Sequence, residues 1–113
     1  MINFIDIKKE KALLKIKNLT KKIKKNYAET IGDGVQIKES FKILNNCLKD
    51  KTIDRKDEAL KLRPFIAAMH NLSARYYVQS IFEYLAGCYS ISIWSADACL
   101  SEMKEELVKL KKR

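Results

Sequence analysis

Few side chains in this chain of 113 residues could carry out acid–base or metal chemistry. His70 is the only histidine, and no nucleophile-elbow motif surrounds a serine or a cysteine. The sequence holds no Glu-x-x-His pair, which di-iron bundles use, and no glycine-rich phosphate loop. His70 and three cysteines, Cys47, Cys88 and Cys99, would make four zinc ligands, but zinc sites usually place ligands in close pairs, which are missing here. We therefore predict no metal, no cofactor and a non-enzymatic role.

The spacing of Arg63 and His70 offers one catalytic alternative. Six residues, Pro-Phe-Ile-Ala-Ala-Met, separate them, and this spacing resembles the Arg-x(4 to 6)-His signature of HEPN ribonucleases. Those enzymes are small helical bundles that pair their Arg and His in a dimer cleft. The resemblance implies that His70 would assist proton transfer at a ribose 2′-hydroxyl and that Arg63 would stabilise phosphate charge.

The segment His70-Asn71-Leu72-Ser73-Ala74 offers a second one. It resembles the His-x-Leu-Lys-Gly core of histidine phosphotransfer domains, which are helical bundles of this size. Ser73 and Ala74 stand where that family has the Lys and Gly that steady and admit the phosphoryl group.

Positive charge is concentrated at one end of the chain. The net charge is +9, and the first 25 residues, with nine lysines against Asp6 and Glu10, account for +7 of it. A concentrated positive pole attracts phosphates or acidic surfaces. We therefore predict a small non-enzymatic helical binding protein that contacts nucleic acid or another polyanion. The candidate contact residues are Lys8, Lys11, Lys15, Lys22 and Lys25.

Other functions remain open at this point. The lysines could be a solvated helix face, or the chain could be a protein–protein interaction module, such as a small subunit of a complex. Bacteriocin immunity proteins are similar to it in size, lysine content and expected helical fold, so an immunity-type protein is included in this alternative. A basic, amphipathic first helix is also compatible with binding to a membrane surface. The numerous Tyr, Phe and Trp residues are compatible with a homodimer.

Two surface features would separate the leading hypotheses. A continuous basic face that joins the first helix to the carboxy-terminal cations would favour nucleic acid. An exposed apolar patch of several hundred Å² would favour a protein partner. The carboxy-terminal cations of the first feature are Lys109, Lys111, Lys112 and Arg113.

Composition and periodicity predict an all-α fold. The chain has only three glycines and one proline, fewer than an all-β protein of this size would need. Apolar residues of the first segment recur at steps of seven, four, three, four and four, which places them on one helical stripe. These residues are Ile5, Ala12, Ile16, Leu19, Ile23 and Tyr27. The expected helices cover about 5–28, 36–49, 54–63, 64–93 and 96–111.

These expectations define a single domain, 1–113, built as a compact antiparallel bundle of four or five helices. Asp54 is predicted to cap the third helix, Pro64 to open or kink the fourth, and Ser95 to cap the last. The start of the chain does not look like a secretory signal, and its apolar runs are too short to span a bilayer. With three unpaired cysteines, this favours a reducing, cytoplasmic location.

Overall fold

The computed structural model describes residues 3–26 and 33–111, without the side chains at positions 24, 26, 106, 107 and 109–111. Six helices, more than the four or five predicted, and no strand occur in this part of the chain, and the predicted all-α bundle is confirmed. The helices are α1 (Phe4–Asn26), α2 (Gly34–Lys49), α3 (Arg55–Lys61), α4 (Arg63–Ala68), α5 (Leu72–Ala86) and α6 (Tyr89–Lys111). Among these helices, none combines the length and the apolar character that crossing a bilayer requires.

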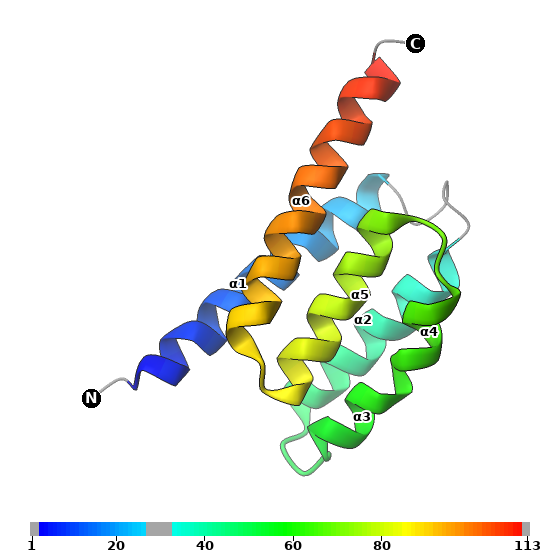
Figure 1. Ribbon diagram of the computed structural model, residues 1–113. Helices are drawn as coiled ribbons and strands as arrows, with labels where there is room; N and C mark the ends of the chain where they lie inside the picture. Colours follow the sequence, from blue (N-terminus) through cyan, green and yellow to red (C-terminus); the bar gives the residue numbers. More distant parts are fainter. Residues whose placement is uncertain (1–2, 27–32, 112–113) are drawn as a thin grey trace.

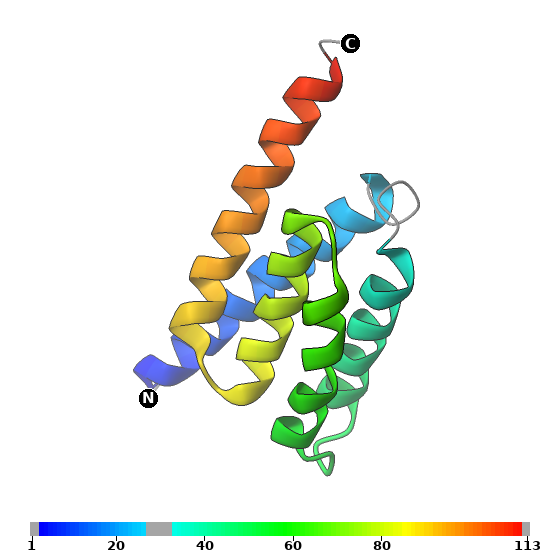
Figure 2. The same cartoon turned by 45° about the vertical axis from the view of Figure 1, so that its right-hand side comes forward.

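Helix α5 lies at the centre of the bundle. It packs against α1 and α6 on one side and against α2, α3 and α4 on the other (Figures 1 and 2). More than half of its residues are buried, as expected of a helix whose apolar side chains point in nearly every direction. These are Ser73, Ala74, Tyr77, Val78, Ser80, Ile81, Glu83, Tyr84 and Leu85.

The prediction of one helix over 64–93 is wrong, because the helix is interrupted twice within this range. Met69 and Asn71 adopt extended conformations, and the Asn71 side chain caps α5 by accepting the N–H of Ala74 at 3.0 Å. Gly87 ends α5 in the left-handed region with a φ of 90°, which glycine adopts without steric cost. The segment therefore forms α4, α5 and the start of α6.

The predicted start of the last helix is also wrong. Helix α6 begins at Tyr89, and Ser95 is a buried residue within it rather than its cap. The Ser95 hydroxyl donates to the Glu83 carboxylate at 2.9 Å, a contact between α5 and α6 that local sequence does not reveal. Ser92 donates to the Cys88 carbonyl oxygen one turn earlier, at 3.2 Å. Serines that alternate with apolar residues are thus accommodated in a helix.

Two other local predictions are confirmed. The Asp54 carboxylate accepts the backbone N–H groups of Lys56 and Asp57, at 3.0 and 3.4 Å, and so caps α3. Pro64 stands in the first turn of α4, where its missing N–H costs no hydrogen bond.

The apolar stripe of α1 is buried as predicted at Ala12, Ile16, Leu19 and Ile23. Ile5 is an exception, with 57% of its surface exposed. Its turn lies at the outer end of α1, away from α5 (Figure 1). The last predicted member, Tyr27, lies outside the described residues.

Candidate functional site

The five candidate lysines share one edge of α1. They recur at steps of three, four, seven and three residues, and Asn18 occupies the turn between Lys15 and Lys22. An α-helix places such positions in one row along its axis. Lys11, Lys22 and Lys25 are exposed, whereas Lys8 and Lys15 are half-buried. At a rise of 1.5 Å per residue, this lysine stripe (Lys8, Lys11, Lys15, Lys22 and Lys25) is about 26 Å long.

The half-buried lysines contact α6. The Lys8 ammonium group donates to the Ser90 hydroxyl at 2.9 Å, and the Lys15 ammonium group forms an ion pair with the Asp97 carboxylate. Both contacts join residues that are 82 positions apart in the chain. Seven residues along α1 therefore match seven residues along α6, so the two helices run side by side in the same direction. Their seam has the lysine stripe on one side and Ser90 and Asp97 on the other.

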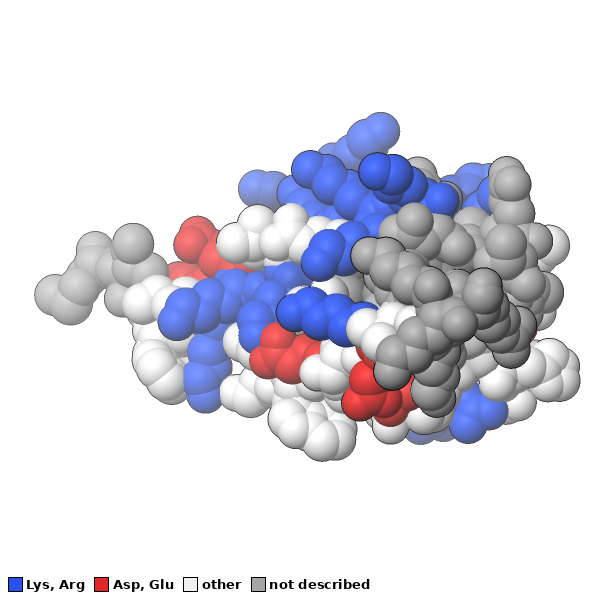
Figure 3. All heavy atoms as spheres, turned by 90° about the horizontal axis from the view of Figure 1, so that it is seen from above, with Lys and Arg blue, Asp and Glu red and all other residues white. Residues whose placement is uncertain are grey.

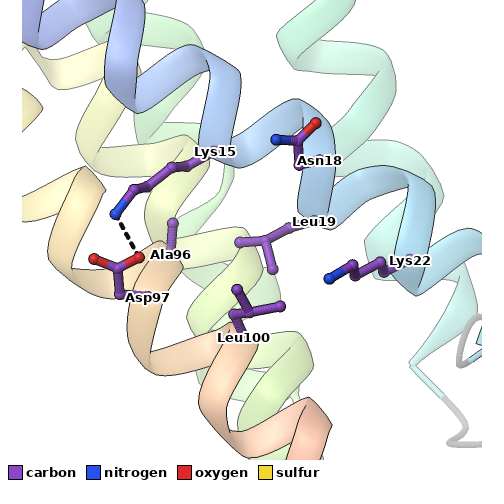
Figure 4. Close-up of a pocket in the computed structure, with 7 residues that line it drawn as sticks. All are labelled: Lys15, Asn18, Leu19, Lys22, Ala96, Asp97 and Leu100. Carbon is purple, nitrogen blue, oxygen red and sulfur yellow. Dashed lines mark hydrogen bonds and ion pairs between the residues drawn. The ribbon is translucent and has the colours of Figure 1, made fainter.

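A cleft of about 250 Å³ opens in this seam (Figure 4). Lys15 and Lys22 lie at its two ends, and apolar side chains of both helices lie between them (Figure 4). Asp97 is the single acidic group in its lining. Two cations beside one carboxylate leave this cleft with excess positive charge. The lining consists of Lys15, Asn18, Leu19, Lys22, Ala96, Asp97 and Leu100.

Basic side chains outnumber acidic ones on the face seen from above in Figure 3. The predicted continuation of the basic face to the carboxy terminus concerns Lys109, Lys111, Lys112 and Arg113, whose side chains lie outside the described residues. On α1, the described basic surface includes the lysine stripe together with exposed Lys17 and Lys21 on the outer side of the helix.

Apolar side chains are exposed around the amino-terminal half of the stripe. Phe4 is 68% and Leu14 61% exposed, and both line a hollow that is floored in part by half-buried Ile93 of α6. A second hollow, at the start of α6, lies beside the first and shares Phe4 and Lys8 with it. We call the first hollow the apolar groove; it is lined by Phe4, Ile7, Lys8, Lys11, Leu14, Lys15 and Ile93.

The apolar groove was not predicted from the sequence. Phe4, Ile7 and Leu14 are spaced by three and seven residues, which indicated a second apolar row beside the lysines. The Lys8 ammonium group lies 4.5 Å from the centre of the Phe4 ring, within the range of a cation–π contact.

Arg63 and His70 stand at opposite ends of α4. Arg63 begins the helix, and its guanidinium group lies 5.8 Å from the centre of the Phe82 ring. His70 follows the helix end by two residues, and both side chains are exposed. A ribonuclease role for this pair stays a prediction.

The connection before α5 is held by a buried carboxylate from another part of the chain. Asp33, just before α2, accepts the backbone N–H groups of His70 and Asn71, at 3.3 and 2.9 Å. The Arg75 guanidinium group donates to the Met69 carbonyl oxygen in the same connection, at 2.7 Å. A carboxylate at the amino-terminal end of α5 is also favoured by the helix dipole. Asp33 therefore holds α2 against the break between α4 and α5.

The cysteines differ in their exposure to solvent. Cys47 and Cys99 are buried and Cys88 is exposed. Burial raises the pKa of the Cys47 thiol, which keeps it protonated and unreactive. Within the described ranges, no group of three or more His, Cys, Asp or Glu side chains gathers as metal ligands would.

Comparisons of the chain with protein-family models, with curated proteins and with solved structures found no match in any of the three. The function can therefore be inferred only from the charges, contacts and exposed surfaces described above. Of these, the lysine stripe with its cleft and the apolar groove are the two features that a globular core does not require.

Proposed function

We propose that the protein is a non-enzymatic binding protein whose lysine stripe contacts the phosphate backbone of a nucleic acid. One observation carries this proposal: five lysines lie in a single row of about 26 Å along the edge of α1, beside a cleft with excess positive charge.

The geometry favours contacts to phosphate groups over the reading of bases. Lysine presents a compact point charge on a flexible stem, which suits phosphate oxygens. The residues that line the cleft include no aromatic ring on which a base could stack. Phosphate contacts position a protein on nucleic acid without reading sequence. We therefore expect binding that is independent of base sequence and strongly dependent on salt.

The test is a fluorescence-anisotropy titration of labelled DNA and RNA, single-stranded and double-stranded, at several salt concentrations. If about four or five phosphates are neutralised, a plot of log K against log salt concentration should have a slope of about −4 on duplex DNA. Scrambling the base sequence should leave the affinity unchanged.

A matched pair of double variants separates the stripe from the overall charge. K22E/K25E and K38E/K42E change exposed lysines on α1 and on α2, and each lowers the net charge from +9 to +5, since each substitution subtracts two charges. We expect K22E/K25E to abolish most binding and K38E/K42E to retain most of it. Equal losses in both variants would mean that only net charge matters, and the proposal would then be wrong.

A further inference from the structure

We propose that the apolar groove docks an acidic amphipathic helix of a partner protein. This inference concerns a different ligand from the proposed nucleic acid, and its site shares Lys8, Lys11 and Lys15 with the amino-terminal part of the lysine stripe. It rests on three properties of the groove, namely its exposed apolar area, the charge of its rim and its shape between two helices.

The exposed apolar area is larger than a monomer surface requires. Phe4 and Leu14 expose about two-thirds of their surfaces, and Ile7 exposes more than a third. A large aromatic side chain alone offers 150–250 Å², so these three residues together present roughly a few hundred Å². Clustered apolar area of this size, rimmed by polar groups, is typical of protein interaction sites.

The lysines that line the groove indicate that its partner is acidic. Lys8, Lys11 and Lys15 line the groove among its apolar residues, and its lining contains no acidic side chain. A second copy of the chain would bring lysines against lysines at a net charge of +9 on each molecule, which disfavours self-association. A partner with carboxylates on both sides of an apolar row would instead pair with these lysines.

The shape favours a helix as the docked element. Helices α1 and α6 run side by side in the same direction, as shown by the matching Lys8–Ser90 and Lys15–Asp97 contacts. On α1 the apolar residues of the groove, Phe4, Ile7 and Leu14, recur at steps of three and seven positions, and Ile93 faces them from α6. A third helix fills it with its own i, i+3 and i+7 residues.

Fluorescence anisotropy of a labelled peptide supplies the readout, since Trp94, although 67% exposed, does not line the groove. The probe is a peptide of about three heptads with leucine at the a and d positions and glutamate at e and g. The control peptide carries lysine in place of glutamate. We expect the labelled acidic peptide to give a saturable rise in anisotropy, and the labelled basic peptide to give none.

Substitutions in the groove locate the binding. F4S/L14S removes two exposed apolar side chains of α1, so folding should be unaffected, and circular dichroism with thermal melting checks this. We expect it to weaken the peptide at least about tenfold. The matched control is V35S/L60S, which removes exposed apolar side chains of α2 and α3 and should bind like the wild type. The single variant L14S provides the same comparison with less perturbation.

The two proposals can fail separately. F4S/L14S should still bind nucleic acid, whereas K22E/K25E should lose nucleic acid and keep most of its peptide affinity. The docking proposal is overturned if the acidic peptide does not bind or if V35S/L60S weakens it equally. It is also overturned if F4S/L14S abolishes binding to phosphatidylserine vesicles while the peptide gives no signal, or if the groove proves to mediate dimerisation in analytical ultracentrifugation.

Discussion

Lys15 and Asp97 form an ion pair across the seam between α1 and α6. Asp97 is also the single carboxylate in the lining of the adjacent cleft, so it neutralises part of the charge that a polyanion would meet there. The same contact thus joins two helices and opposes the proposed binding. Removal of the carboxylate should affect these two properties in opposite directions.

We predict that D97N binds nucleic acid a few times more tightly than the wild type, because Lys15 is released and one repulsive charge is lost. The loss of folding stability should be small, at most about 1 kcal/mol, since both partners are partly exposed. Anisotropy titrations and urea unfolding measure the two effects. E39Q makes the same charge change at an exposed position on α2 and should leave the affinity unchanged. Weaker binding by D97N would show that Asp97 is needed to arrange the cleft.

The burial of the apolar stripe of α1 can be tested within that helix. Ile16 is fully buried and Leu14 is largely exposed, although they are two residues apart. We predict that I16A lowers the free energy of unfolding by about 2–5 kcal/mol, because it leaves a cavity against the core. L14A should change it by less than about 0.5 kcal/mol. Urea denaturation of both variants gives the comparison, and similar losses would contradict the placement of α1.

Asp33 should contribute more to folding stability than an exposed aspartate that accepts a similar number of hydrogen bonds. D33A leaves the N–H groups of His70 and Asn71 without their acceptor in a buried place, so we predict a loss of about 1–3 kcal/mol on unfolding. Asp50 accepts the N–H and the hydroxyl of Thr52 on the surface, where water can replace it. D50A should therefore cost much less. If the two variants unfold at the same urea concentration, the Asp33 contact is not structural.

Alkaline pH should destabilise the fold through buried tyrosines. Burial raises the pKa of the Tyr77 hydroxyl well above its usual value near 10, although a hydrogen bond with Thr20 at 2.6 Å acts in the opposite direction. Burial also raises the pKa of Tyr84. Because the folded-state pKa is higher than the unfolded one, the contribution is fully present below about pH 10 and is lost as the pH rises further.

The Y77F variant isolates this effect. It lacks the ionisable hydroxyl and the hydrogen bond to Thr20, so we expect it to be less stable than the wild type at neutral pH. The difference should shrink between about pH 9 and pH 11, because only the wild type loses the Tyr77 contribution. Urea unfolding across this pH range measures the difference in stability. The titration of lysines affects both proteins equally and so does not contribute to this difference. Curves that stay parallel would contradict the assigned shift.

Local sequence patterns were sufficient for much of the fold. The 3.6-residue periodicity of Ala12, Ile16 and Ile23 correctly predicted the buried face of α1. Asp54 as a cap and Pro64 in a first turn act through neighbouring backbone groups, so they could be recognised without tertiary contacts. The break at Met69 and the continuation of α6 through Ser95 could not be recognised, because they depend on Asp33, Arg75 and Glu83 from elsewhere in the chain.

The sequence by itself determined the helical class, the positive charge of the first segment and the spacing that puts five lysines on one edge of α1. These properties depend on residue type and on the geometry of a single helix. Only the tertiary structure decided that Lys8 and Lys15 are engaged by Ser90 and Asp97, and that Phe4 and Leu14 remain exposed. Such facts depend on the packing of α1 against α6, between residues more than 80 positions apart, which no local pattern specifies.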